Sequence, residues 1–271
     1  MTEHRSERAQ VLLTIDCGNS TFDLRLCDVD GVPIRRERQV DLDLARFVGD
    51  RTPFVVASSV RSDRWAIVER ELEGKGWPVR IAGVDFACPL QLAYPNPKEL
   101  GTDRWIGALA AVRRHGDAVV IDCGTAVTWN VVRRDGVFLG GAIGLGLRSQ
   151  IRSMRERAPE LPDIEDAVLE AAELPRLPAV TTLDSLVLGI HRAFVHSLVG
   201  LRAELQVKAG LAAVTTVVTG GDAWLVLGGG GADLLGPRVV VESELIHDGL
   251  ADLGRRSLGR IEFGRNGVHP E

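Results

Sequence analysis

The chain has 271 residues, of which 45% are hydrophobic and 25% charged, and its formal net charge is −5 with a pI near 5.8. That length holds one large domain or two smaller ones around proper cores. The acidic balance lacks the broad basic surface that nucleic-acid binding requires, so we expect no nucleic-acid partner; charge alone does not exclude a small acidic substrate.

The cysteine and hydropathy patterns favour a cytoplasmic protein. The four cysteines form no C-x-x-C pair and have no histidine at zinc-binding spacing, so we expect reduced thiols. The longest apolar runs, such as Val11–Ile15, are too short to cross a bilayer. The opening MTEHRSERAQ mixes charges of both signs and lacks the long apolar stretch of a signal peptide. We therefore expect no membrane partner.

Apolar runs and turn signals predict mostly strands at the start of the chain. Gly18-Asn19-Ser20 and Asp30-Gly31 favour turns between strands, and Trp65, Val68 and Leu72 have helical spacing. The expected strands are Val11–Ile15, Leu24–Cys27, Ile34–Val40 and Pro53–Ser59, and the expected helices are Arg64–Lys75 and Leu100–His115.

A similar order of elements is expected further along the chain. Residues 159–178 hold four prolines and six acidic residues, which predicts a connection with a short helix inside it. The expected strands are Ala118–Ile121, Thr128–Arg133, Val137–Leu139 and Val214–Thr219, and the expected helices are Leu183–Leu201 and Leu245–Leu253.

One short motif occurs twice in matched context. Ile15-Asp16-Cys17-Gly18-Asn19-Ser20 returns 106 residues later, from position 16 to position 122, as Ile121-Asp122-Cys123-Gly124-Thr125-Ala126. Each copy follows an apolar strand and precedes a second strand, and the distance is far above the period of a solenoid repeat. The repeat predicts a duplicated α/β fold with halves 11–114 and 115–260 and a ligand in the cleft between them.

Each copy of the motif has the residues that a phosphate site needs. Glycine at the tip of a strand–turn–strand hairpin lets a polyphosphate approach the backbone N–H groups, and small polar side chains add donors. Two hairpins facing each other would hold ATP from both sides, which is most of what phosphoryl transfer requires. Two ordinary turns are the alternative. The expected phosphate-binding residues are Asp16, Gly18, Asn19, Ser20, Gly124, Thr125 and Thr128.

Other polar residues suggest a cation site and an acceptor site. Asp16 and Asp122 can hold a cation such as Mg²⁺, which prefers oxygen ligands. Asp103 either caps a helix or orients and deprotonates a substrate hydroxyl, and Arg104 suits an anionic group. Thr182 lies where a helix N-cap or an anion contact is expected. An acceptor with a primary alcohol and a carboxylate fits the adjacent Asp-Arg pair.

Taken together, these motifs resemble the type III pantothenate kinases of the actin-like ATPase superfamily. The likeness extends from Leu13 to about Gly254. It rests on an ordered set of short motifs: D-C-G-N-S (16–20), Ser58-Ser59-Val60, Y-x-x-P-x-x-L-G-x-D-R (94–104), D-C-G-T-A-x-T (122–128), G-G-A-I (140–143), Thr182 seven residues before Gly189, T-G-G (219–221) and L-x-x-x-G-L (245–250).

The resemblance implies a fold, an activity and roles for particular residues. The fold is the duplicated actin-like (ribonuclease H-like) ATPase fold, with two β-β-β-α-β-α type halves. The activity is transfer of the γ-phosphate of ATP to the 4′-hydroxyl of pantothenate, the first step of coenzyme A biosynthesis, in a homodimer. Asp103 matches the proton acceptor and Asp122 the ligand of an activating K⁺ or NH₄⁺. The substrate-binding positions that match are Tyr94, Gly101, Thr102, Arg104 and Thr182.

Two departures from the family pattern and two alternative functions stay open at this point. Gly144-Leu145-Gly146 replaces the usual Ala-Pro-Gly, and Asp23 stands where some relatives carry a basic residue. An actin-like kinase for another small hydroxy acid or sugar is one alternative. A non-catalytic relative that regulates transcription is the other, although such a protein could lose Asp16, Asp103 and Asp122, which are all present.

Overall fold

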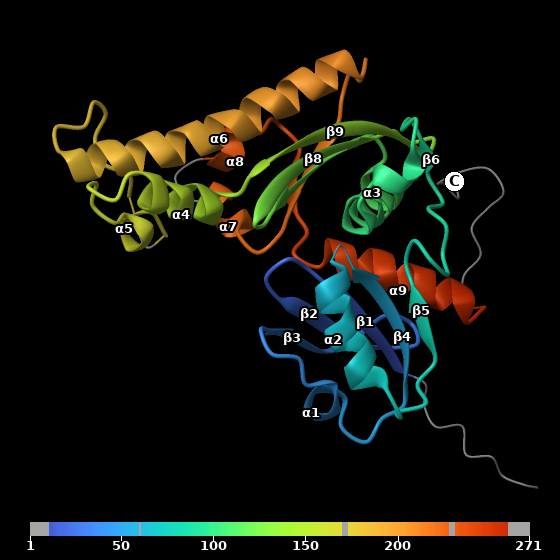
Figure 1. Cartoon of the computed structure of the whole chain (residues 1–271). Helices are drawn as coiled ribbons and strands as arrows, with labels where there is room; N and C mark the ends of the chain where they lie inside the picture. Colours follow the sequence, from blue (N-terminus) through green and yellow to red (C-terminus); the bar gives the residue numbers. More distant parts are fainter. Residues whose placement is uncertain (1–10, 60, 170–172, 228–230, 260–271) are drawn as a thin grey trace, which may run out of the picture. The chain divides into compact units, whose positions relative to one another are not determined.

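The computed structural model describes residues 11–59, 61–169, 173–227 and 231–259, and its elements are shown in Figure 1. The chain divides into two compact units. Unit 1 comprises residues 1–91, 95–110 and 244–271, and unit 2 comprises residues 92–94 and 111–243. Each unit is described by itself below.

Unit 1 is built on a five-stranded sheet of order β3-β2-β1-β4-β5. The β1–β2 and β2–β3 pairs are antiparallel, whereas β4 runs parallel to β1 and to β5. The strands are β1 (Val11–Cys17), β2 (Phe22–Asp28), β3 (Pro33–Gln39), β4 (Pro53–Ser59) and β5 (Val79–Ile81). β1 and β4 are almost continuously apolar because central strands of such a sheet are covered on both faces.

Different helices cover the two faces of this sheet, because successive side chains of a strand point to opposite sides. Leu13, Ile15 and Leu24 belong to an apolar core that includes residues of α1 (Leu44–Val48) and α2 (Ser62–Leu72). α9 (Leu245–Ser257) packs on β1 and β4. A Cβ at Gly254 would lie 2.7 Å from the Leu12 side chain, so glycine allows this close packing.

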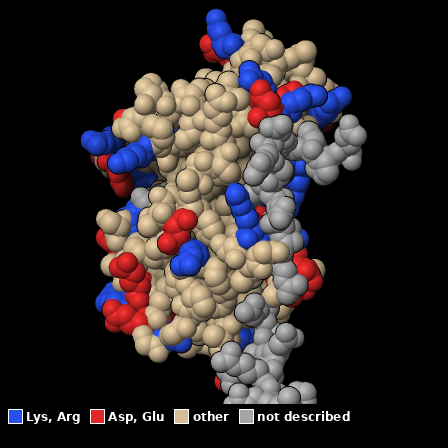
Figure 2. Space-filling model, turned by 90° about the vertical axis from the view of Figure 1, so that its right-hand side faces the viewer, with Lys and Arg blue, Asp and Glu red and all other residues tan. Residues whose placement is uncertain are grey.

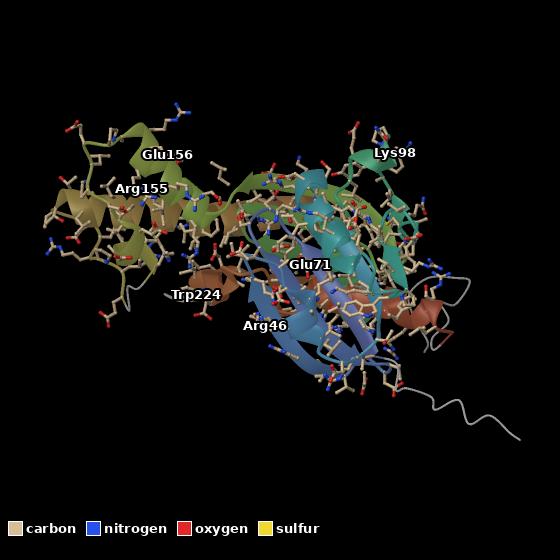
Figure 3. All side chains as sticks on the ribbon, turned by 60° about the horizontal axis from the view of Figure 1, so that its bottom comes forward. Arg46, Glu71, Lys98, Arg155, Glu156 and Trp224 are labelled. Carbon is tan, nitrogen blue, oxygen red and sulfur yellow. The ribbon has the colours of Figure 1, made fainter. Side chains whose placement is uncertain are left out.

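Polar contacts join α1 to its neighbours in unit 1. The backbone N–H of Leu44 donates to Oε2 of Glu71 on α2 over 3.2 Å, and Arg46 pairs with Glu37 on β3. Figure 3 labels Arg46 and Glu71 on these two helices. The edge strand β3 is therefore tied to the helical layer by charged groups and not by apolar packing alone.

Unit 2 is built on a six-stranded sheet of order β11-β10-β7-β8-β9-β6. β7, β8 and β9 are antiparallel neighbours, while β10 is parallel to β7 and to β11. The strands are β6 (Gln91–Leu92), β7 (Ala118–Cys123), β8 (Ala126–Val132), β9 (Val137–Leu145), β10 (Thr215–Thr219) and β11 (Val239–Val241). β6 lies at the boundary between the units.

The helices complete the description. α3 (Thr102–His115) passes from unit 1 into unit 2 after residue 110, and η1 (Pro97–Glu99) precedes it. The helices of unit 2 are α4 (Leu147–Arg157), α5 (Glu165–Leu169), α6 (Thr182–Lys208), α7 (Ala223–Leu227) and α8 (Gly231–Leu234). Charged side chains lie in small groups of mixed sign on the face seen in Figure 2.

α6 is long and apolar enough to count as a candidate membrane span by length and composition. It packs on β7 and β8, and Val187, Phe194 and Leu198 are buried in the core of unit 2. Nε1 of Trp129 on β8 donates to the carbonyl of Leu198 over 3.3 Å. These contacts are those of a core helix, which passes the same test of length and hydropathy.

Most expected elements are confirmed, and β4 matches its predicted range. β9 is longer than expected and includes the stretch around Gly141, where a Cβ would overlap the carbonyl oxygen of Trp129. That glycine therefore serves close backbone packing. The expected halves 11–114 and 115–260 divide the chain by its repeat, whereas contacts place residues 244–260 in unit 1; the halves stay a prediction.

Candidate active site

The first copy of the repeated motif is the β1–β2 hairpin of unit 1. Asp16 stands near the carboxyl end of β1, and its turn is closed by a 3.1 Å hydrogen bond from the Gly18 N–H to the Thr21 carbonyl. Asn19 and Ser20, at the tip, are exposed. The hairpin thus presents glycine backbone and two small polar side chains to solvent beside a carboxylate.

Asp16 lies in surroundings that disfavour its charge. Burial raises the pKa of its carboxyl group to about 7, against a 2.8 Å hydrogen bond from Oγ of Ser58 that lowers it. The carboxylates of Asp103 and Asp23 raise this pKa further, and the Arg38 guanidinium lowers it. A carboxyl group whose charge is disfavoured by burial and by other carboxylates can be stabilised in its charged form by a cation.

Asp103 is the second residue of α3 and not its N-cap, because the helix begins at Thr102. Oγ1 of Thr102 donates to the Ser59 carbonyl over 3.3 Å, which fixes the start of α3 near the end of β4. A Cβ at Gly101 would lie 2.6 Å from Oδ1 of Asp103, so the absence of a side chain there makes room for the carboxylate. Arg104, the next residue, is buried.

Burial raises the pKa of Asp103, while the backbone N–H and the charge of Arg104 lower it. A carboxylate with a raised pKa is a better proton acceptor than an exposed one. The charge of Asp103 raises the pKa of Asp16, so unit 1 brings the predicted phosphate hairpin and the predicted base into one neighbourhood.

The second copy of the motif is the β7–β8 hairpin of unit 2, around Asp122. The Gly124 N–H donates to the Ala126 carbonyl over 3.1 Å, and the Thr125 carbonyl accepts from the Gly146 N–H over 3.0 Å. A Cβ at Gly146 would overlap the Gly124 carbonyl oxygen. Gly146, which keeps the glycine of the family pattern, therefore supports the hairpin by close backbone contact.

The T-G-G turn packs directly on this second hairpin. Gly220 has a φ of +93°, and a Cβ there would overlap Oδ1 of Asp122 and the Cys123 carbonyl oxygen. The Asp222 N–H donates to the Cys123 carbonyl over 2.9 Å, and Asp222 pairs with Arg148 on α4 over 2.9 Å. Beyond the turn, Trp224 on α7 is 53% exposed (Figure 3).

The remaining expected residues of unit 2 lie in three places. The Tyr94 ring packs against Phe138 with centroids 5.9 Å apart. Thr128 is buried on β8 and its hydroxyl accepts from the Asn130 amide over 3.0 Å. Thr182 is exposed at the start of α6, where Thr181 is the N-cap: its hydroxyl accepts from the Asp184 N–H over 3.1 Å. Thr182 itself is thus not the cap.

The comparison with known proteins identifies the family of the chain. The sequence profile of the family described as "Type III pantothenate kinase" matches residues 12–204. The chain belongs to this family. It is 28% identical over 233 residues to "Type III pantothenate kinase" of Geotalea uraniireducens (strain Rf4), covering 80% of this chain and 89% of that protein.

Solved structures similar to this pantothenate kinase family member share its fold, the α/β actin-like ATPase fold with two mixed sheets. One is described as a "conserved putative Baf family transcriptional activator from Campylobacter jejuni", with a TM-score of 0.58, 20% identity, and coverage of 92% of this chain and 100% of that one. Another is the "ethanolamine utilization protein EutJ from Carboxydothermus hydrogenoformans", with a TM-score of 0.54, 13% identity and 89% coverage of both chains.

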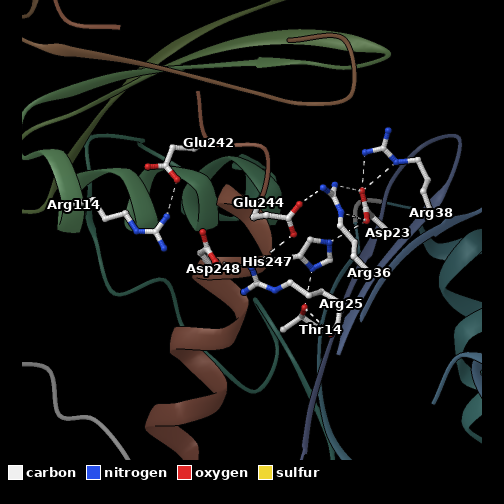
Figure 4. A network of polar contacts seen from close by, with 10 residues as sticks. All are labelled: Thr14, Asp23, Arg25, Arg36, Arg38, Arg114, Glu242, Glu244, His247 and Asp248. Atoms are coloured by element: carbon white, nitrogen blue, oxygen red, sulfur yellow. Dashed lines mark hydrogen bonds and ion pairs between the residues drawn. The ribbon is translucent and has the colours of Figure 1, made fainter. Parts of the chain in front are cut away.

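Sequence reasoning missed several polar residues around the first hairpin of this family member. Asp23 was noted as a departure, but its contacts with Arg36, Arg38 and His247 were not predicted (Figure 4). The alternation of Arg36 and Arg38 on one face of an expected strand was the signal that could have revealed the arginines. No sequence pattern links His247 to a residue more than two hundred positions away.

Proposed function

We propose that this chain transfers the γ-phosphate of ATP to the 4′-hydroxyl of pantothenate, the first step of coenzyme A biosynthesis. The observation that carries the proposal is membership of the type III pantothenate kinase family over residues 12–204. The presence of Asp16 and Asp103 in one neighbourhood of unit 1 supports it, because a phosphate loop and a proton acceptor must act on the same reacting groups.

Asp103 is the proposed general base. Its raised pKa suits removal of the proton from the acceptor hydroxyl as the phosphoryl group is transferred. Arg104 is proposed to bind the pantothenate carboxylate through its fork of N–H donors. The further proposed substrate contacts are Tyr94, Gly101, Thr102 and Thr182.

The two hairpins are proposed to hold the ATP phosphates. Gly18, Asn19 and Ser20 supply backbone and small polar donors from one hairpin, and Gly124, Thr125 and Thr128 supply them from the other. The exposure of Asn19, Ser20 and Thr125 supports this assignment, because these groups are accessible to a ligand.

Two cations are part of the proposal. Asp16 is proposed to hold Mg²⁺ together with ATP oxygens, and its environment suits a divalent cation because its charge is disfavoured by burial and by two neighbouring carboxylates. Mg²⁺ is commonly bound by one or two carboxylates together with substrate phosphates rather than by a cage of protein side chains. When bound, Mg²⁺ would neutralise phosphate charge. Asp122 is proposed to bind K⁺ or NH₄⁺.

The setting of the reaction is also proposed. The family is one of metabolic kinases, and the sequence favours a cytoplasmic location and a homodimer, as its resemblance to the family implies. The size of the particle in solution, measured by light scattering, tests the dimer.

A coupled assay of ADP release tests the proposed activity. The purified chain is incubated with MgATP and pantothenate in potassium buffer, and with a panel of hydroxy acids and sugars in parallel. Pantothenate-dependent ADP release, with the phosphorylated product identified by mass spectrometry, is expected. Release with another acceptor and not with pantothenate would favour an actin-like kinase of different specificity, and no release with any acceptor would favour a non-catalytic role.

A further inference from the structure

Four polar residues form a row across the sheet of unit 1. Asp23 is the register partner of Arg38 on β3 and of Asp16 on β1, and Asp16 is in turn the partner of Ser58 on β4. Directly paired residues of neighbouring strands project from the same face of a sheet. The row therefore runs Arg38, Asp23, Asp16, Ser58 along one face, level with the first hairpin.

Asp23 is the anchor of this row. Nε and Nη2 of Arg38 donate to its Oδ2 over 3.1 and 2.7 Å, and Arg36 donates to both oxygens over 3.3 and 3.0 Å. Nε2 of His247 lies 3.2 Å from Oδ1, and Nδ1 of the same ring lies 2.7 Å from Oγ1 of Thr14 (Figure 4). The hydrogen bonds from His247, Arg36 and Arg38 hold the pKa of Asp23 far below its usual range, despite burial.

The two arginines on β3 differ in what else they touch. Arg36 also pairs with Glu244, which precedes α9, and so has a carboxylate on each side. Arg38 is 46% exposed, and the described part of the chain gives it no hydrogen-bond or ion-pair partner except Asp23. Its Nε and Nη2 groups donate to Asp23, and its Nη1 donors therefore stay available to a ligand.

The position of Arg38 matters because the surroundings of Asp16 are acidic. The charges of Asp103 and Asp23 both raise the pKa of Asp16, and Arg38 is a cation whose charge opposes them there. A polyphosphate arriving at this hairpin would meet like charge from all three carboxylates. A fixed guanidinium offsets that repulsion and offers planar N–H donors to phosphate oxygens.

We infer that Arg38 binds the polyphosphate of the nucleotide held by the first hairpin, and that Asp23 is its positioning residue. This inference rests on the proposed function, since it assumes that the hairpin of Asp16 takes the ATP phosphates. Arg38 on β3, held by Asp23 on β2, thus provides the positive charge that residues 16–23 of the first hairpin lack.

Isothermal titration with AMP, ADP and ATP tests the inference on the full chain. Arg38→Ala is expected to weaken ATP and ADP binding about tenfold or more, the size of a hydrogen bond to a charged group, and to change AMP binding less. Arg38→Lys should restore part of the loss. Arg35→Ala is the matched control, because it removes the same charge from the same strand. Arg35 lies on the other face of that strand, where it stacks on Phe47.

A double-mutant cycle tests the role of Asp23. Asp23→Asn is expected to weaken ATP binding, and combining it with Arg38→Ala should add little, because both changes remove the same contact. Additive losses would show that Asp23 does not act through Arg38. The same variants should raise the KM for ATP more than they lower kcat, whereas a general loss of folding would lower the melting temperature and kcat together.

The outcomes separate the inference from the proposed function. Equal ATP affinity in wild type and Arg38→Ala, or equal losses in Arg38→Ala and Arg35→Ala, would overturn the inference and leave pantothenate phosphorylation untouched. If wild type binds ATP through Arg38 but releases no ADP with pantothenate, the inference stands and the proposed acceptor is wrong. A wild-type chain that binds no ATP overturns both.

Discussion

Ser58 and Asp16 are register partners on the parallel strands β4 and β1, and Oγ of Ser58 donates a 2.8 Å hydrogen bond to Oδ1 of Asp16. The contact holds the carboxylate by one oxygen and favours its charged form against burial. It also shows how the sheet itself orients a side chain of the site, since both residues are fixed by neighbouring backbone ladders.

Ser58→Ala is expected to shift the acidic limb of the ATP-binding profile to higher pH. The hydrogen bond from Ser58 lowers the pKa of Asp16, so its loss raises that pKa and keeps the carboxyl group neutral over a wider range, by about half a pH unit to one unit. The apparent affinity for MgATP is measured from pH 5.5 to 8.5. Ser59→Ala is the control, because the Ser59 hydroxyl donates to the Arg61 carbonyl instead; equal profiles in wild type and Ser58→Ala would contradict the prediction.

Asp16→Asn is expected to be more stable than wild type at neutral pH. The pKa of Asp16 is about 7 in the folded protein against a reference of 3.8, so the unfolded chain loses this proton at lower pH than the folded one. The free energy of unfolding of wild type therefore falls as pH rises from about 4 to about 7, by at most about 4 kcal/mol from this group. Urea unfolding of both proteins across that range measures the difference, which should grow with pH; a difference independent of pH would show that Asp16 is not perturbed.

Asp103→Asn is expected to lower kcat by about two or more orders of magnitude, within the range for loss of a general base. Asparagine keeps the size of the side chain, so folding should be retained. Asp63→Asn is a matched control, because Asp63 is likewise the second residue of its helix, α2, but is exposed and pairs with Arg61. Near-normal turnover of folded Asp103→Asn would mean that this carboxylate only stabilises the helix.

Gly141→Ala is expected to destabilise unit 2 by at least about 3 kcal/mol, since its Cβ would overlap the Trp129 carbonyl oxygen in the neighbouring strand. Gly200→Ala on α6 should instead stabilise the protein by about 0.5–1 kcal/mol, because nothing lies within 4 Å of a Cβ there and alanine favours a helix. Thermal unfolding of the two variants measures the contrast. Similar melting temperatures would contradict the close packing of β8 and β9.

Replacing potassium by sodium is expected to lower kcat if Asp122 holds an activating monovalent cation. Na⁺ is smaller than K⁺ and fits a site shaped by carboxylate and carbonyl oxygens differently. Steady-state rates are compared in the two salts at equal ionic strength, with choline as a reference cation too large for the site. Equal rates in potassium, sodium and choline would count against a specific site at Asp122.

Several strands and the longest described helix could be predicted from sequence because local signals fix them. β4 and β7 are short apolar runs bounded by turns, and α6 has apolar residues at helical spacing over many turns. α4 was missed because its sequence, LRSQIRSMRER, is mostly polar, and only Leu147 and Ile151 are buried. The short strands β5 and β11 have three residues each and depend on pairing with a neighbour.

Some residues of the candidate site could likewise be predicted from the sequence, and others could not. Asp16 and Asp103 could be recognised because each lies in a motif of nearby residues. The contacts of Asp23 depend on the register of β2 with β3 and on the return of α9, and no local pattern specifies either. Register is set by the packing of the whole sheet, so Arg38 becomes visible only once the strands are paired.

The return of α9 to unit 1 has a consequence for synthesis of the chain on the ribosome. Unit 2 is complete once residue 243 has emerged, but β1 and β4 still lack the helix that covers Leu12 and Val56 and that supplies His247. The strands β1 and β4, which are translated before all of unit 2, therefore acquire their full hydrophobic cover only after unit 2 is complete. Until then the nascent polypeptide exposes an apolar surface of the kind that chaperones recognise.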